Sequence, residues 1–178
     1  MPIATIQVAA TSVPDQWTLG LGPNKVVAVQ SPDDDNTTRI DESTVHDKEQ
    51  YTLAASGIPA GSTINTVTVR SRSLGGLDRG VTVGLVLGGN TSIGPDHLND
   101  VYTTFNDILP RPGGGAWLLA DLPGLEVFCE KHGAVAGGVR CTSLWVLVDY
   151  TLPAGGSGSG AVFGPRPLYP RGRKRIIH

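Results

Sequence analysis

The chain has 178 residues and a formal net charge of −2, a length that suits one domain with a buried core. Its 24 glycines, 13 prolines and single methionine favour many short strands joined by tight turns over long helices. No apolar stretch approaches the roughly 18–20 residues of a membrane helix. The N-terminus lacks the basic and apolar regions of a secretory signal, so we expect a soluble protein made in the cytoplasm, without membrane contact.

Periodicity and turn residues predict the elements in chain order. We expect strands at residues 3–11, 25–30, 50–53, 59–73, 81–87, 101–105, 127–129 and 139–151. Turn-rich or polar segments separate them, at residues 15–24, 31–38, 74–80, 91–100 and 109–115, whereas residues 39–49 have no clear pattern. In the first of these segments, Trp17, Leu19 and Leu21 alternate toward a core. One short helical turn is expected in residues 116–126, where leucines recur at helical spacing before a Pro-Gly pair.

The strand within residues 59–73 has one apolar and one polar side. Pro59 and Gly61 form a turn, and a run rich in valine and threonine follows. Alternation puts Val67, Val69 and Ser71 on one side. Thr68, Arg70 and Arg72 fall on the other side, so this strand needs a second apolar layer to cover its dry face.

The strand at residues 139–151 is apolar on both sides. Leu144, Val146, Val148 and Tyr150 share one face, and Trp145 and Leu147 share the other before Asp149. Such a strand is either covered on both sides within the fold or meets a neighbouring subunit. We expect it to form a hairpin with residues 127–129.

These elements predict an all-β fold, an antiparallel β-sandwich or jelly roll of about eight strands with at most one short helix. Residues 1–152 form the sandwich domain, residues 153–160 a Gly/Ser linker, and residues 161–178 an extended basic C-terminal arm.

The charge is distributed unevenly along the chain. Residues 1–149 hold nine Lys and Arg against sixteen Asp and Glu, about −7, whereas the remainder has five basic and no acidic residues, about +5. A basic arm attached to an acidic body predicts that the arm binds a partner. Its candidate docking residues, basic and apolar, are Phe163, Leu168, Tyr169, Arg171, Arg173, Lys174, Arg175, Ile176 and Ile177.

Three interpretations of the arm stay open. It docks on the acidic body of another copy, with its apolar residues as anchors, which we favour. Alternatively, Arg171, Arg173, Lys174 and Arg175 neutralise nucleic-acid phosphates while Tyr169 stacks on a base. In the third interpretation the arm is solvated and binds nothing.

Two small clusters are candidate sites. Asp33, Asp34 and Asp35 are weak candidates for binding Ca²⁺, because their spacing differs from an EF-hand and a solvated turn is the favoured explanation. Cys129 and Cys141 lie on opposite arms of the predicted hairpin, as two buried thiols or as a disulfide.

No residue set matches a catalytic motif. The histidines His46, His97, His132 and His178 fall in separate polar segments, and no nucleophile motif accompanies them. Asp121 and Glu126 are interpreted as charges at a helix end, not as a carboxylate pair for glycoside hydrolysis. We therefore expect no enzymatic activity and no cofactor.

Four segments together resemble a group of tailed-bacteriophage virion proteins of the β-sandwich, decoration or tail-component type. They are PDDDNTTRID (32–41), GIPAGSTINTVTVRSRS (57–73), PGGGAWLLADLPGLEVF (112–128) and LWVLVDYTL (144–152). The resemblance spans roughly residues 25–152 and leaves out the arm. It implies a sandwich present in many copies on a capsid or tail, with other copies and other virion proteins as partners. The alternative function is a carbohydrate-binding or adhesion module, which requires exposed aromatic side chains in a shallow groove.

Overall fold

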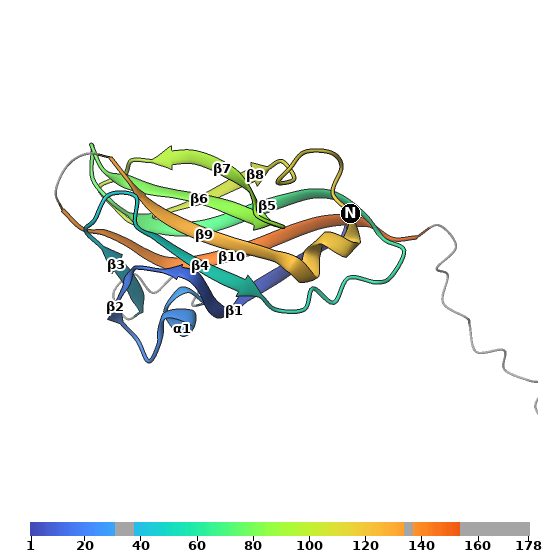
Figure 1. The fold of residues 1–178 in the computed structure, drawn as a ribbon, viewed down its shortest axis with the longest axis horizontal. Coiled ribbons are helices and arrows are strands. Elements are labelled where there is room, and N and C mark those ends of the chain that lie inside the picture. The colour runs from blue at the N-terminus through green and yellow to red at the C-terminus, as the bar shows by residue number, and fades with distance from the viewer. Residues whose placement is uncertain (31–37, 134–136, 154–178) are drawn as a thin grey trace, which may run out of the picture.

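The computed structural model describes residues 1–30, 38–133 and 137–153, which fold as an antiparallel β-sandwich (Figure 1). The expected all-β class is confirmed. The described residues form ten strands: β1 (Ile3–Asp15), β2 (Thr18–Leu21), β3 (Arg39–Glu42), β4 (Lys48–Leu53), β5 (Thr63–Leu74), β6 (Gly80–Leu87), β7 (Asn90–His97), β8 (Thr103–Leu109), β9 (Leu125–His132) and β10 (Val139–Thr151). Two short helices accompany them, α1 (Lys25–Gln30) and the 3₁₀ helix η1 (Leu119–Gly124).

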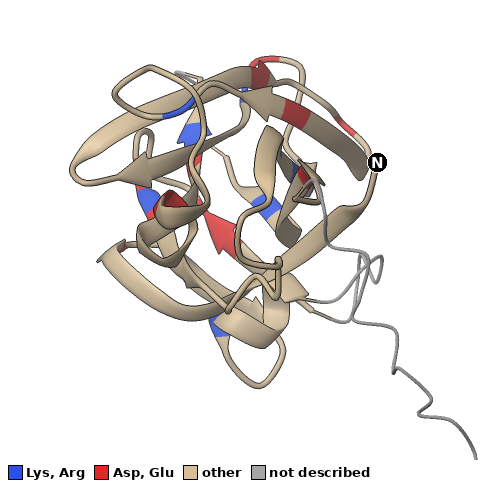
Figure 2. Ribbon diagram, turned by 90° about the vertical axis from the view of Figure 1, so that its right-hand side faces the viewer, with Lys and Arg blue, Asp and Glu red and all other residues tan. Residues whose placement is uncertain are grey.

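The strands make two facing layers, which we name sheet A and sheet B (Figure 2). Sheet A contains β8, β5 and β10, with β3 and β2 along one end of β10. Sheet B runs β4, β9, β6, β7. Strand β1 joins the layers, because Ile3–Gln7 pair with β10 and the remainder pairs with β4.

The layers are also tied together at their other edge. His97 of β7 and Asp107 of β8 are both buried, and His97 Nε2 lies 2.6 Å from Asp107 Oδ2. Phe105 stacks on the His97 ring at 3.7 Å between centroids. This polar contact is shielded from water, so it holds the two edges in one arrangement.

Strand β5 has the two faces that its sequence predicts. Val67, Val69 and Ser71 are fully buried between the sheets, and Arg70 and Arg72 lie on the outer face. The two-sided pattern of β10 is also confirmed. Val146 and Val148 are fully buried in the core, whereas Trp145 and Leu147 lie half-buried on the outside of sheet A. The core therefore consists of the inward residues of both sheets.

Residues 25–30 form helix α1, so the prediction of a strand there was wrong. Asn24 caps the helix, because its Oδ1 accepts the backbone N–H of Val27 at 2.9 Å. Ala28 and Val29 are fully buried against the sandwich. An apolar run of six residues fits a strand or a helix by pattern alone, and here the cap and the packing decide.

Other boundaries also differ from the predictions. β7 occupies most of the expected polar excursion at 91–100, because Gly88 and Gly89, both with positive φ, form a tight turn that pairs it with β6. β2 and β3 are short strands in segments where we expected none. Trp17 is buried as expected, but Leu19 and Leu21 are about 40% exposed, because β2 lies at a sheet edge. η1 matches the predicted helical turn.

Cys129 and Cys141 do not lie on one hairpin, which corrects that prediction. β9 pairs with β4 and β6, whereas β10 pairs with β1, β3 and β5, so the two strands belong to opposite layers. Both cysteines are free thiols that point into the core, and burial raises the pKa of Cys129 well above its ordinary value.

Candidate interaction surface

The outer face of sheet A is built from aligned rows of side chains. In one row, Ile108 of β8, Thr68 of β5 and Leu147 of β10 stand opposite one another. In the next row, Arg70 lies opposite Trp145. Ile108 is 69% exposed. The register thus places apolar and basic side chains side by side on an open sheet, as protein interfaces often do.

Trp145 and Arg70 form the centre of this face. The Arg70 guanidinium carbon lies 5.5 Å from the Trp145 ring, a cation–π contact. No carboxylate pairs with Arg70 among the residues that the structure describes, and Trp145 Nε1 donates to no acceptor there. A partner with acceptor groups would satisfy Arg70, whereas Trp145 Nε1 is itself buried. Tryptophan and arginine are also the residues that contribute most energy to interfaces.

The position of Arg70 over Trp145 is also relevant to the alternative function, carbohydrate binding. A sugar stacks on an exposed aromatic face, and the Arg70 guanidinium occupies a face of Trp145. Tyr102 is covered similarly, with Arg72 5.9 Å from its ring. These contacts leave less aromatic surface for a sugar on sheet A.

The outer face of sheet B has the opposite character. Glu126 and Glu130 alternate with Phe128 along β9, and the Phe128 ring is fully buried beneath Lys48, whose Nζ lies 4.0 Å from the ring centroid. Phe128 lies over Gly84, where an added Cβ would come within 2.3 Å of the ring. Because Gly84 has no side chain, the Phe128 ring can lie flat against the sheet.

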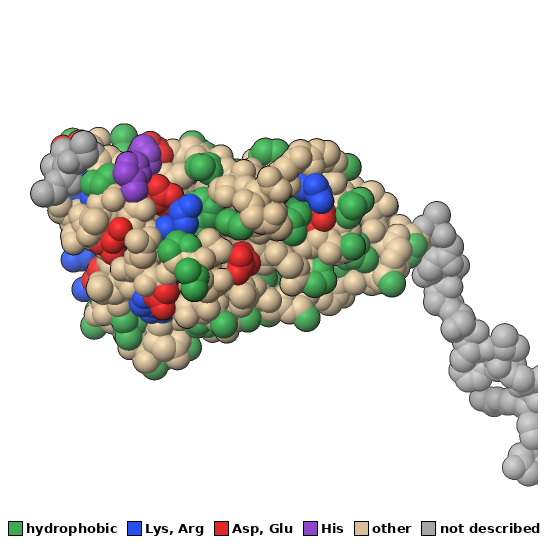
Figure 3. Space-filling view, in the orientation of Figure 1, with side chains coloured by type: hydrophobic (Ala, Val, Ile, Leu, Met, Phe, Trp, Pro, Cys, Tyr) green, Lys and Arg blue, Asp and Glu red, His purple; other side chains and the backbone are tan. Residues whose placement is uncertain are grey.

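Two histidines gather at one end of sheet B. His46 Nδ1 lies 3.1 Å from Glu130 Oε1, and His132 Nδ1 lies 2.6 Å from Asp96 Oδ2. The two imidazole rings meet edge to face at 5.5 Å between centroids. Figure 3 shows the histidine side chains next to acidic ones on this face. Within residues 1–30, 38–133 and 137–153, no group of three or more His, Cys, Asp or Glu side chains is arranged to hold a metal ion.

A charge cluster around the buried Glu49 anchors helix α1. Lys25 contacts Asp15 and donates to Glu49 Oε2 at 3.1 Å. Glu49 Oε2 also accepts the backbone N–H of Trp17 at 3.0 Å. Glu49 is fully buried, and burial raises its pKa to about 7 despite the attraction of Lys25. The cluster thus pins α1 and the segment after β1 against the sheet.

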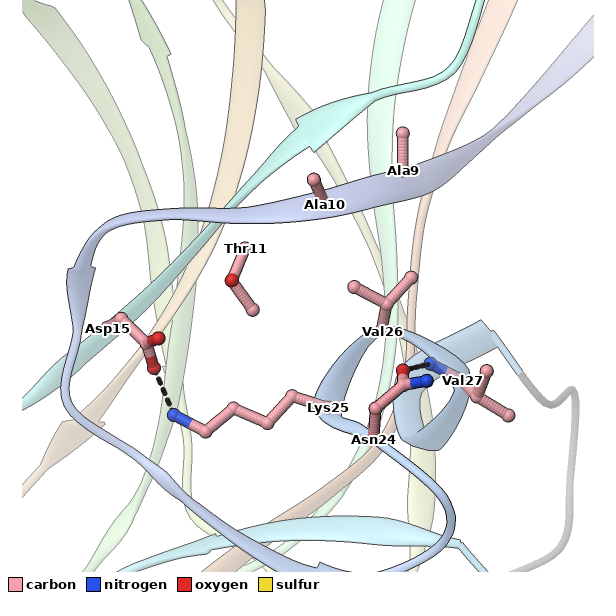
Figure 4. Close-up of a pocket in the computed structure, with 8 residues that line it drawn as sticks. All are labelled: Ala9, Ala10, Thr11, Asp15, Asn24, Lys25, Val26 and Val27. Carbon is pink, nitrogen blue, oxygen red and sulfur yellow. Dashed lines mark hydrogen bonds and ion pairs between the residues drawn. The ribbon is translucent and has the colours of Figure 1, made fainter.

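An open hollow of about 510 Å³ lies beside this cluster, between β1 and α1. Figure 4 shows Asp15 and Lys25 pointing toward one another across it, with Ala9 and Ala10 along β1. Asn24 is engaged as the helix cap. Asp15, Lys25 and Asn24 in the lining are thus already engaged within the fold, which suits a structural role.

The remaining predicted site residues fall into two groups. Asp121 receives two hydrogen bonds from Arg111, at 2.8 and 2.9 Å, and this contact holds its pKa below the ordinary value. Asp121 also accepts the Leu118 N–H, so it orders the start of η1, as a helix-end charge does. Asp33, Asp34, Asp35 and the whole arm at residues 161–178 lie outside the described residues. No helix in the described part of the chain is long and apolar enough to cross a membrane.

The acidic face of sheet B was missed from the sequence. Its signal is the alternation of Glu126, Phe128 and Glu130 in a segment where only residues 127–129 were expected to be a strand. A longer strand there would have placed both glutamates on one face. Searches with protein-family models and among curated proteins find no match to this chain.

Proposed function

We propose that this protein is a structural virion protein that assembles in many copies on a bacteriophage capsid or tail. Its C-terminal arm, residues 161–178, docks on neighbouring subunits. The observation that supports this most is the outer face of sheet A, where Trp145, Leu147 and Ile108 lie on an open sheet without a covering layer among the described residues. An apolar sheet face of this kind gains free energy when another copy covers it.

The sequence resemblance and the fold favour the same function. A sandwich without long helices is a rigid unit that can repeat in a lattice, and the basic arm can tie each unit to the next. Such a protein functions through its contact surfaces and needs no catalytic group.

The test is the assembly state of the purified full chain. We expect size-exclusion chromatography with light scattering and negative-stain electron microscopy to show defined oligomers, rings or tubes. We expect the chain to decorate capsid shells or tails of the virus that encodes it. A monomer of 18.6 kDa at all concentrations that binds no particle would contradict the proposal. Binding on a glycan array would instead favour the carbohydrate alternative.

A further inference from the structure

The outer face of sheet B carries negative charge along β9. Glu126 accepts hydrogen bonds from two neutral side chains, Ser12 at 2.6 Å and Gln50 at 2.8 Å. No cation pairs with Glu126 among the described residues. Each carboxylate oxygen has a second lone pair, so Glu126 can still accept from an arginine. Its negative charge is therefore open to a basic partner.

Glu130 continues this acidic strip on the same face. It lies 3.4 Å from Lys48 Nζ and 3.1 Å from His46 Nδ1, so Lys48 balances one of the two carboxylate charges on β9 and the charge of Glu126 stays unbalanced. Asp96 of β7 adds a third carboxylate nearby, beside His132. Glu126 and Glu130 are four residues apart on one strand, which is about 13 Å at the rise of an extended chain.

The arm of the same chain has matching chemistry. Arg171 and Arg175 are also four residues apart, so an extended segment would present them at the same spacing of about 13 Å. Arg173 lies between them, and no acidic residue follows Asp149. Arg171 lies eighteen positions after Pro153, a reach of up to about 60 Å, which suffices to cross to another copy.

The outer face of sheet A is a poor receptor for this arm. Arg70, Arg72 and Arg140 lie on it and outnumber the carboxylates there, Asp149 and the Asp41 that pairs with Arg140, so the face repels a basic arm. The chain thus has one basic face, one acidic face and a basic arm. We propose that residues 161–178 of one copy bind the acidic strip of β9, Glu126 and Glu130, on the outer face of sheet B of a neighbouring copy. This rests on the proposed function, and it names the surface that receives the arm.

The first experiment measures binding of a labelled peptide of residues 161–178 by fluorescence anisotropy. The receptor is the full chain with its own arm neutralised, by Arg171→Gln, Arg173→Gln, Lys174→Gln and Arg175→Gln, so that it does not compete. Adding Glu126→Gln and Glu130→Gln to the receptor should weaken binding about tenfold, because two surface ion pairs are lost. Binding should also weaken as salt is raised.

The matched control is Asp149→Asn, which removes one negative charge from the outer face of sheet A. It should leave peptide binding unchanged. Equal loss in the control, or unchanged binding in the glutamate variant, would overturn the inference.

A charge exchange adds a gain of binding, which an unfolded receptor could not produce. A receptor with Glu126→Lys and Glu130→Lys should lose the native peptide and bind one with Arg171→Glu and Arg175→Glu. Failure to exchange partners would sink the idea, as would an oligonucleotide that binds the wild-type chain regardless of Glu126 and Glu130. Wild-type monomers whose own arm blocks the strip would also refute docking between copies.

The two proposals can fail separately. Oligomers that form through Glu126 and Glu130 but decorate no capsid or tail would refute the virion function and keep this surface. Decorated particles without peptide binding would refute this surface and keep the function.

Discussion

Glu49 is a fully buried carboxyl whose ionisation depends on the folded state. Burial raises its pKa from 4.5 to about 7. Between pH 4.5 and 7, the Glu49 carboxyl therefore keeps its proton in the folded chain and loses it in the unfolded chain. Stability from this group is therefore present below about pH 4.5 and is lost as pH rises through 7. We expect the free energy of unfolding to fall by about 2–3 kcal/mol between pH 5 and 8.

The check is urea denaturation at several pH values in wild type and in Glu49→Gln. The amide cannot ionise, so the variant should lose most of this slope over the same range. An identical slope in both proteins would show that another group controls it. The control variant Asp149→Asn, on the outer face of sheet A, should keep the wild-type slope.

Gly84 is the residue on which the position of Phe128 depends. A Cβ there would lie 2.3 Å from Phe128 Cζ and 2.5 Å from the backbone oxygen of Ser92, and the backbone atom cannot easily move. We expect Gly84→Ala to destabilise the fold by about 1–3 kcal/mol, as overpacking does. Thermal unfolding measures this. Gly124→Ala is the control, because its Cβ would meet only Leu87 at 4.0 Å, and it should change little.

At the scale of elements, alternation along a strand was the most informative signal. β5 and β10 are long, and each has valines at every second position, so their inward and outward faces could be assigned from the sequence. The outer face of sheet A was predictable to that extent. Its row-by-row register was not, because pairing partners far apart in the chain are set by tertiary packing.

Short elements were the least predictable. Helix α1 has six residues, too few for a helical period to separate it from a strand, and its cap at Asn24 was not recognised. β7 is an edge strand, and its polar residues led to the prediction of a loop. The cluster of Lys25, Asp15 and Glu49 joins three elements, so no local spacing could reveal it.

At the scale of the whole molecule, the proposed assembly predicts that different residues determine the stability of the folded chain and the association between copies. Leu147 and Val146 are neighbours on β10 that face opposite ways, Leu147 outward on sheet A and Val146 fully buried in the core. Leu147→Ser removes apolar area only from the outer face, so it should weaken self-association and leave the melting temperature of the dissociated chain within a few degrees.

Val146→Ala, in contrast, opens a cavity in the core. It should cost about 2 kcal/mol of stability and lower the melting temperature by roughly 4–8 °C in a domain of this size. Its outer face is unchanged, so oligomers should form with wild-type affinity at temperatures where the variant is folded. Sedimentation velocity over a concentration series and thermal unfolding together separate the two effects. Equal association of wild type and Leu147→Ser would mean that copies do not meet through sheet A, and the contact between them would have to lie on another surface.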